Sequence, residues 1–240
     1  MERITEGKDM NMAVPSAGEP SGSKGVPVDL EHYSRRRLFE CFRHRALPVL
    51  SISTEIDITG FAAAVDAQEL RFFTTLCCLI SKTINSIPNF RHRIVADVLV
   101  EFAAVSPSIT VALDDGNFSF ADPAYTGHFL DDYAGVRLAI EAAKLNPNQD
   151  FRVGEGVDSL FFLTHLPWLS FTGVQHPYIP EYASIPVITT GRSFLRDGKE
   201  MLPIAVQANH ALVDGVHVAR FLEVLTHHCR GFGRALASER

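Results

Sequence analysis

Apolar side chains recur at helical spacing in two stretches of the chain. Within residues 70–86 they return every three or four positions, at Leu70, Phe73, Leu76, Cys77, Ile80 and Ile84. This spacing puts an apolar stripe along one face of a helix, and Pro88 ends the pattern. Residues 216–230 repeat the stripe with Val218, Phe221, Leu222, Leu225 and Cys229. Both stretches are therefore predicted to be helices that face a core.

Shorter elements fill much of the remaining chain. Helices are expected over residues 34–45, 61–67 and 131–144. Apolar runs bounded by turn residues predict strands over residues 51–58, 94–104, 108–113, 159–164, 170–174, 187–194 and 201–208. Residues 114–126 are predicted to be a polar loop. Because strands outnumber helices and their connections are of both hairpin and crossover length, the pattern favours an α/β layer fold with a mixed sheet.

Residues 1–27 differ from the rest of the chain. They are rich in glycine, serine, proline and charged residues, with only isolated aliphatic side chains. Such a segment buries too little apolar surface to offset the entropy cost of ordering it. We expect a disordered tail over residues 1–27 and a single domain over residues 28–240.

Composition and charge narrow the classes of partner. The 240 residues carry a net charge of −6, which gives no basic surface for nucleic acid. The four cysteines lie in apolar stretches without a CxxC pair, which favours reduced thiols inside a cell. No amino-terminal signal core and no apolar run of about 18 residues is present. We therefore expect a cytoplasmic protein without nucleic-acid or membrane partners.

The segment most informative about chemistry surrounds His210. This histidine precedes an Asp214-Gly215 pair by four residues, between an apolar strand and the final helix. Histidine changes its protonation near neutral pH and so suits a general base for proton removal from a hydroxyl. The alternative is a hydrogen-bonded loop histidine. Asp214, for its part, also stands where a carboxylate caps a helix.

These residues and several other segments resemble the chloramphenicol acetyltransferase family, whose signature is His-His-x-x-x-Asp-Gly. Residues 72–93 (FFTTLCCLISKTINSIPNFRHR) are similar to the family's long helix and its N-x-x-P-x-F-R ending. Residues 166–172 (LPWLSFT) resemble its N-P-W-x-S-F-T strand, residues 56–61 (IDITGF) its L-D-I-T-x-F, and residues 29–42 its amino-terminal helix. The segments keep the family's order over roughly residues 28–235. The resemblance implies a mixed-sheet two-layer sandwich of the CoA-dependent acyltransferase type.

Two other protein classes carry the HxxxDG pattern. Dihydrolipoyl acyltransferases bring a lipoyl domain, and none is visible in this sequence. Peptide-synthetase condensation domains need two such halves in one chain, and this chain supplies one. The order of the resembling segments favours the chloramphenicol acetyltransferase type.

The resemblance implies roles for the residues of the signature. His210 would take the proton from an acceptor hydroxyl, which then attacks the thioester of acetyl-CoA. Asp214 would form a structural ion pair with an arginine of the amino-terminal helix, and the matching position is Arg35. Thr164 stands for a family serine whose hydroxyl stabilises the tetrahedral oxyanion. Thr189 matches a threonine that holds an ordered water nearby, although both threonines also suit a strand as such.

Further positions would bind the coenzyme and the acceptor. Trp168 matches a residue that lines the coenzyme A tunnel, with core packing as the alternative. Arg192 replaces a lysine near the coenzyme's phosphates, and a solvated surface charge is the alternative. In the acceptor pocket Ala112 replaces an aromatic residue, which reshapes the pocket and weakens stacking of an aryl group. Phe42 keeps an aromatic side chain in the amino-terminal helix.

The family resemblance implies an acetyl-CoA-dependent O-acetyltransferase that acts on chloramphenicol, as in antibiotic resistance. It implies a homotrimer with sites between subunits, and acetyl-CoA as co-substrate without a permanently bound cofactor. One alternative keeps the chemistry but changes the alcohol or the acyl-CoA. Another is a catalytically degenerate binding protein, which would explain Asn209 in place of the first histidine together with Thr164 and Ala112. His227, His228 and Cys229 match no standard zinc spacing, so no metal site is expected.

Overall fold

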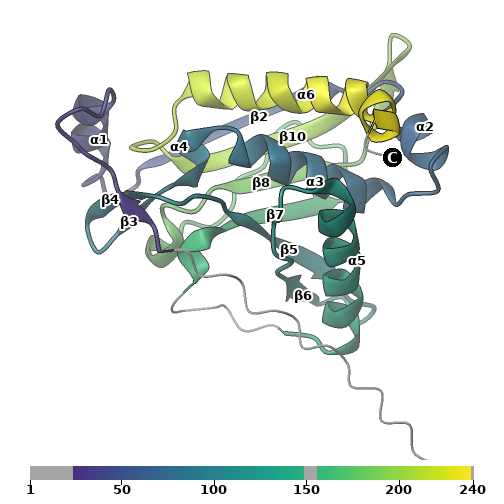
Figure 1. The fold of residues 1–240 in the computed structure, drawn as a ribbon, viewed down its shortest axis with the longest axis horizontal. Coiled ribbons are helices and arrows are strands. Elements are labelled where there is room, and N and C mark those ends of the chain that lie inside the picture. The colour runs from purple at the N-terminus through teal and green to yellow at the C-terminus, as the bar shows by residue number, and fades with distance from the viewer. Residues whose placement is uncertain (1–23, 149–155, 239–240) are drawn as a thin grey trace, which may run out of the picture.

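A mixed sheet of seven strands forms the centre of the computed structural model, which describes residues 24–148 and 156–238 (Figure 1). The strand order is β2-β10-β8-β7-β5-β6, and β9 pairs with β10. The strands are β2 (Val49–Asp57), β5 (Ser106–Ala112), β6 (Phe118–Ala121), β7 (Leu160–Leu166), β8 (Val187–Gly191), β9 (Phe194–Arg196) and β10 (Lys199–Asn209). Only the β5–β7 and β7–β8 pairs are parallel among these described strands.

A second, three-stranded sheet lies beside the first. It has the order β1-β4-β3 and consists of β1 (Val26–Pro27), β3 (His92–Val95) and β4 (Val98–Glu101). Because β1 pairs with β4, the folded part begins before Val28, so the boundary expected from the sequence is two residues too late. Residues 1–23 of the predicted tail lie outside the described residues.

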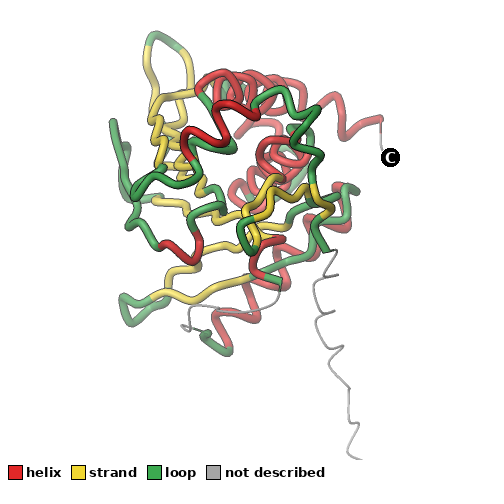
Figure 2. Tube along the Cα trace, turned by 90° about the vertical axis from the view of Figure 1, so that its left-hand side faces the viewer, coloured by secondary structure: helices red, strands yellow, loops and turns green. Residues whose placement is uncertain are grey.

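The larger helices cover one face of the sheet. Figure 1 shows α3, α5 and α6 in front of the strands, and the view turned by 90° shows them gathered on one side (Figure 2). The helices are α1 (Arg36–Phe42), α2 (Phe61–Asp66), α3 (Phe72–Asn85), α4 (Pro88–Arg91), α5 (Phe129–Leu145) and α6 (Gly215–Ser238), with short 3-10 helices at Val157–Ser159 and Pro180–Tyr182. The two stripes predicted from helical spacing are thus the inner faces of α3 and α6.

Strand side chains alternate between two environments. Toward the helices they enter the apolar core, as do Ile109, Leu163, Ile188, Ile204 and Val206. The alternate positions face the other side of the sheet and are more polar, namely Ser108, Thr110, Thr164, Thr189 and Gln207. Successive strand residues point to opposite faces, so the sheet separates the packed core from a second face that the helices do not cover, which carries these polar side chains together with apolar ones such as Phe162 and Val187.

Several of the expected elements differ from the structure. Residues 94–104 do not form one strand, because Ala96 and Asp97 take left-handed conformations (φ 47° and 65°) and turn the chain into the β3–β4 hairpin. The polar loop predicted over residues 114–126 contains β6, which pairs with β5. The strand predicted over residues 170–174 is wrong, because this segment is irregular and follows a turn at Leu169.

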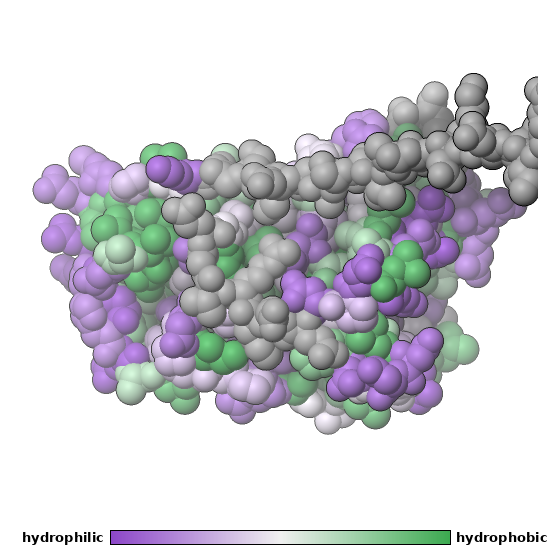
Figure 3. Space-filling model, turned by 90° about the horizontal axis from the view of Figure 1, so that it is seen from below, coloured by the Kyte–Doolittle hydropathy of each residue, from purple (hydrophilic) through white to green (hydrophobic). Residues whose placement is uncertain are grey.

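The described surface carries apolar and polar patches side by side when seen from below (Figure 3).

All four cysteines are free, with Cys41 exposed and the other three buried. Burial raises the pKa of Cys77 and of Cys229 to about 12, which keeps these thiols protonated. No helix in the described ranges is both long enough and apolar enough to span a membrane.

Candidate active site

His210 lies at the point where β10 ends, and three neighbours fix its position. Its backbone N–H donates to the carbonyl of Pro48 at 2.7 Å. The ring of Phe42, from α1, packs on the imidazole with the ring centroids 4.1 Å apart. Arg35 donates to the His210 carbonyl at 3.4 Å. The amino-terminal segment and the end of the last strand therefore meet at this histidine, although 168 positions separate Phe42 from His210 in the sequence.

The tautomer of His210 follows from its hydrogen bond. Its Nδ1 lies 3.2 Å from the carbonyl oxygen of Val213. A carbonyl oxygen only accepts, so Nδ1 carries the proton in the neutral ring and Nε2 keeps its lone pair. The ring packs against Phe42 with an angle of 35° between the two planes, which limits its rotation. The ring of His210 is thus oriented so that Nε2 can accept a proton.

Asp214 both caps α6 and forms an ion pair. Its carboxylate accepts the backbone N–H of Gly215 at 2.6 Å, and Arg35 Nη1 lies 3.3 Å from its other oxygen. The Gly215 N–H bond and, after it, Arg35 lower the pKa of this carboxyl, despite an opposing effect of partial burial. The sequence left two interpretations of Asp214 open, a helix cap and an ion pair, and Asp214 makes the contacts of both. We call Arg35, Phe42, His210 and Asp214 the histidine cluster.

Asn209 stabilises the turn that carries His210. Its side-chain oxygen accepts the N–H of Ala211 at 3.0 Å, and its carbonyl accepts the N–H groups of Leu212 and Val213 at 2.9 Å each. The residue is 4% exposed. The asparagine that replaces the first histidine of the signature thus has a structural role in the loop.

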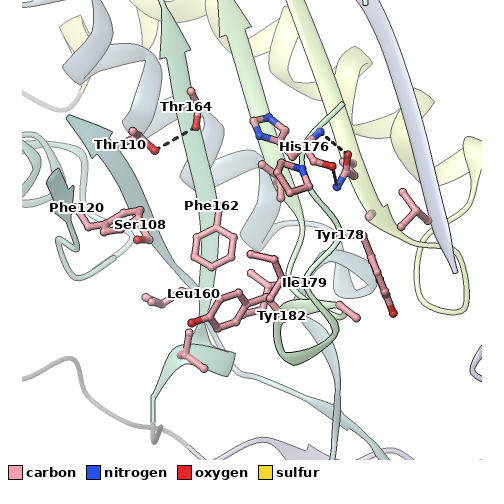
Figure 4. Close-up of a pocket in the computed structure, with 18 of the residues that line it drawn as sticks. Ser108, Thr110, Phe120, Leu160, Phe162, Thr164, His176, Tyr178, Ile179 and Tyr182 are labelled. Atoms are coloured by element: carbon pink, nitrogen blue, oxygen red, sulfur yellow. Dashed lines mark hydrogen bonds between the residues drawn. The ribbon is translucent and has the colours of Figure 1, made fainter. Parts of the chain in front are cut away.

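A cavity of about 440 Å³ opens on the sheet face that lies away from the helices. Figure 4 shows a polar end with Thr110, Thr164 and His176, and an end with Leu160 and Tyr182. The volume lies within the range of pockets that hold small organic ligands, about 300–1,000 Å³.

Hydroxyl groups form a row across the polar end of the cavity. Thr110 Oγ1 and Thr164 Oγ1 are 3.2 Å apart on the neighbouring strands β5 and β7. Thr164 is in register with Thr189 on β8. The Thr189 hydroxyl is bonded to His176 Nε2 at 2.6 Å. The two threonines singled out in the sequence are therefore neighbours, and Thr110 and His176 extend the row on either side.

Aromatic side chains line the apolar walls, and the sequence analysis identified none of them as pocket residues. They are Phe118, Phe120, Phe162, Tyr178 and Tyr182. Ala112, by contrast, is exposed and does not line the cavity in the single chain, but it pairs across the strands with Phe118. An aromatic ring from β6 therefore stands beside the position where the sequence has alanine. The sequence signal that could have indicated this aromatic wall is the pair Phe118 and Phe120, which stand two positions apart, as residues on one face of a strand do.

Trp168 and Arg192 lie at one edge of the sheet. Trp168 is 62% exposed, which excludes the core-packing alternative within one chain. Arg192 is exposed as well, and its backbone N–H donates to the Leu169 carbonyl at 2.7 Å. Gly191 permits this approach, because a Cβ atom there would stand 2.7 Å from the same carbonyl oxygen. An exposed indole and a guanidinium group therefore share one edge.

The structure does not bring every expected residue together. His210 and Phe42 are absent from the residues that line the cavity containing Thr164 in the single chain. In the single chain, His210 and the hydroxyl row therefore do not line the same cavity. In the described ranges, no three or more His, Cys, Asp or Glu side chains are grouped so as to hold a metal ion.

Comparison with known proteins gives consistent matches over most of the chain. A family model described as chloramphenicol acetyltransferase matches residues 26–226. Chloramphenicol acetyltransferase 2 of Haemophilus influenzae is 29% identical over 205 residues, which cover 84% of this chain and 95% of that protein. A chloramphenicol acetyltransferase of Clostridium butyricum is 28% identical, over 81% of this chain and 90% of that protein.

Solved structures support the same assignment. A chloramphenicol acetyltransferase superimposes with a TM-score of 0.76 at 25% identity, covering 85% of this chain and 99% of that one. The cubic core of a pyruvate dehydrogenase multienzyme complex shares the fold with a TM-score of 0.59 at 16% identity. These neighbours confirm the mixed-sheet fold of the CoA-dependent acyltransferase type. The protein therefore belongs to the chloramphenicol acetyltransferase family and is an acetyltransferase enzyme.

Proposed function

We propose that this acetyltransferase moves an acetyl group from acetyl-CoA to a hydroxyl of a small molecule, with His210 as general base and chloramphenicol as an acceptor. The observation that carries the proposal is the fixed tautomer of His210, whose Nδ1 is bonded to the Val213 carbonyl at 3.2 Å. A ring held in this way presents Nε2 for proton transfer. Such a base contributes about 10² to 10⁴ in rate.

The proposed reaction starts with the acceptor alcohol at Nε2 of His210. The imidazole takes the hydroxyl proton while the alcohol oxygen forms a bond to the thioester carbonyl carbon. Arg35 holds both the His210 carbonyl and the Asp214 carboxylate, which keeps the loop in place during this step. Collapse of the tetrahedral intermediate breaks the carbon–sulfur bond, and the protonated histidine returns its proton to the departing CoA thiolate.

The negative charge of the tetrahedral intermediate needs a hydrogen-bond donor, and we assign this role to Thr164. Thr110 Oγ1 lies 3.2 Å from Thr164 Oγ1. If Thr110 donates to Thr164, the Thr164 proton is free to point at the developing oxyanion. Removal of one such donor costs about 10² to 10³ in rate.

We further propose a homotrimer in which His210 of one chain meets the cavity of its neighbour. The separation of the histidine cluster from the cavity in the single chain supports this arrangement. The exposed Trp168 and Arg192 would bind coenzyme A, with the guanidinium group on a phosphate. The free cysteines fit a reducing compartment, so we place the enzyme in the cytoplasm.

Release of CoA thiol tests the proposed chemistry. The full chain is mixed with acetyl-CoA and chloramphenicol, and the free thiol is followed with a thiol reagent. We expect release that needs chloramphenicol and is lost in His210→Ala. Thiol release with other alcohols but not with chloramphenicol would show that the acceptor is a different alcohol. Absence of thiol release with every alcohol would reject the proposed function.

Mixed oligomers test the shared site. His210→Ala and a variant with a filled cavity, Ser108→Trp, are each expected to be inactive. Co-expressed chains form oligomers in which an intact histidine of one variant faces an intact cavity of the other. Recovery of activity supports a site between chains, whereas no recovery in verified mixed oligomers contradicts it.

A further inference from the structure

His176 is a titratable side chain in a mainly apolar cavity, and the reaction described above does not use it. It belongs to the irregular segment between β7 and β8 and lines the cavity. Figure 4 shows its ring at the same end of the cavity as the Thr164 hydroxyl. A polar group therefore stands close to the site proposed for the oxyanion.

Both the backbone and the ring of His176 are held. Gln207 of β10 binds the backbone twice, with Oε1 accepting the His176 N–H at 3.0 Å and Nε2 donating to its carbonyl at 3.4 Å. Ser51 donates to the same Gln207 oxygen at 3.3 Å. Thr189 then fixes the ring through Nε2 at 2.6 Å. The imidazole is thus preorganised before any ligand enters.

The bond to Thr189 leaves one ring nitrogen available. Nδ1 of His176 has no hydrogen-bond partner in the part of the chain that the structure describes. Burial lowers the pKa of this histidine, which favours the neutral ring. If Thr189 donates to Nε2, Nδ1–H is a donor, and if Nε2–H donates to Thr189, Nδ1 is an acceptor. In either tautomer Nδ1 can bind a polar group of a ligand.

We propose that His176 determines acceptor specificity by binding, through Nδ1, a second polar group of the acceptor that lies near the hydroxyl to be acetylated. This inference rests on the proposed function and names the class of acceptor: a small aryl or alkyl alcohol with an amide or a further hydroxyl within two or three bonds of the reacting carbon. The apolar walls would hold the remainder of the molecule.

A purely structural role would need only the bond between Nε2 and Thr189. His176 lines the cavity, and a polar ring atom left without a partner there is costly once a ligand excludes water, unless the ligand supplies the partner. Sites built to bind a substrate hydroxyl or N–H discriminate strongly against analogues that lack it. The free nitrogen of His176 has the chemistry for such discrimination.

Three variants distinguish the roles of the two ring nitrogens of His176. In His176→Asn the side-chain amide can occupy the place of Nδ1 but does not reach Thr189. In His176→Gln the longer amide can occupy the place of Nε2 and keep the bond to Thr189 without a group at Nδ1. His176→Leu removes both and serves as the apolar control. Thermal unfolding of each variant verifies that it is folded.

Two acceptors of the same skeleton complete the experiment. Chloramphenicol carries an amide and a second hydroxyl near its primary alcohol, and 3-(4-nitrophenyl)propan-1-ol has the same chain without either group. For each variant, kcat/KM is measured by thiol release with acetyl-CoA, and Kd is measured by calorimetry. We expect His176→Leu and His176→Gln to lose about tenfold or more in kcat/KM for chloramphenicol. His176→Asn should recover part of that loss, and the simple alcohol should vary less than threefold across the series.

The opposite ranking overturns the proposal. If His176→Gln retains chloramphenicol activity better than His176→Asn, the histidine serves Thr189 alone. Equal losses with both acceptors would also overturn it, because the effect would then not depend on the second polar group. If wild type transfers no acetyl group but the Kd values of wild type and the three variants for chloramphenicol follow the predicted ranking, the proposed function fails while this inference stands. Absence of binding of either compound to the wild type rejects the inference.

Discussion

The ion pair between Arg35 and Asp214 offers a quantitative test of how the histidine loop is held. The charged atoms are 3.3 Å apart, with side chains 12% and 35% exposed. Unit charges at about 4 Å attract by about 4 kcal/mol at an effective dielectric constant of about 20. Desolvation and solvent screening offset most of this attraction, and exposed pairs retain only about 0.2–1 kcal/mol. For this partly buried pair we expect a coupling free energy of about 1–2 kcal/mol.

A double-mutant cycle measures this coupling. Arg35→Met keeps the apolar stem of the side chain, and Asp214→Asn keeps an oxygen for the Gly215 N–H. Urea unfolding of the wild type, both single variants and the double variant gives the coupling. Arg35→Met should lower the free energy of unfolding by about 2–3 kcal/mol, because it also removes the donor to the His210 carbonyl.

The rate of CoA thiol release should also respond to loss of the Arg35–Asp214 ion pair. Both single variants are expected to lower kcat by about tenfold to 100-fold, since small misplacement of a catalytic group is costly. A coupling below about 0.5 kcal/mol, together with unchanged kcat in Arg35→Met, would refute the reasoning, because the pair would then neither stabilise the loop nor orient His210.

The remaining predictions concern Thr164, Gly191 and stability at acid pH. Thr164→Val should lower kcat by about 10² to 10³ while Thr164→Ser stays near wild type, and equal effects of both in thiol-release assays would contradict a donor role. Gly191→Ala should destabilise by about 1–3 kcal/mol in urea unfolding and raise KM for acetyl-CoA, because its Cβ would meet the Leu169 carbonyl at 2.7 Å. Burial lowers the pKa of His92 and of His165, so the unfolded state takes up more protons than the folded state. Their contribution to stability is complete above about pH 6.5 and declines as pH falls below it. His92→Gln should flatten the slope of unfolding free energy against pH below that value, and an unchanged slope would contradict this.

Much of the fold could be predicted because its elements have strong periodic signals. The stripe expected over residues 70–86 became α3, and the one expected over residues 216–230 lies within α6. The β3–β4 hairpin escaped prediction because its turn uses Ala96 and Asp97 at positive φ, where Gly or Asn is the usual signal. The segment over residues 170–174 instead makes tertiary contacts, because the Phe171 ring packs near Gly191 and the Ser170 hydroxyl donates to the Arg192 carbonyl at 2.7 Å.

The candidate site likewise has one part that could be predicted from the sequence and one part that could not. The pairing of Arg35 with Asp214 followed from resemblance to a known signature, and the structure shows the contact. The cavity wall did not follow from the sequence, because His176 lies in an irregular segment without periodicity. Its position depends on bonds to Gln207 and Thr189, which are distant in the sequence. Local patterns carry no information about such contacts.

The central claim is that His210 transfers the proton that drives acetylation of an alcohol. Its most direct test compares wild type with His210→Ala in acetyl-CoA and chloramphenicol, following CoA thiol and the mass of the acceptor together. We predict that wild type yields one thiol for each acceptor that gains an acetyl group, and that His210→Ala loses about 10² to 10⁴ in rate. An acetylation rate in His210→Ala equal to that of the wild type would contradict the account.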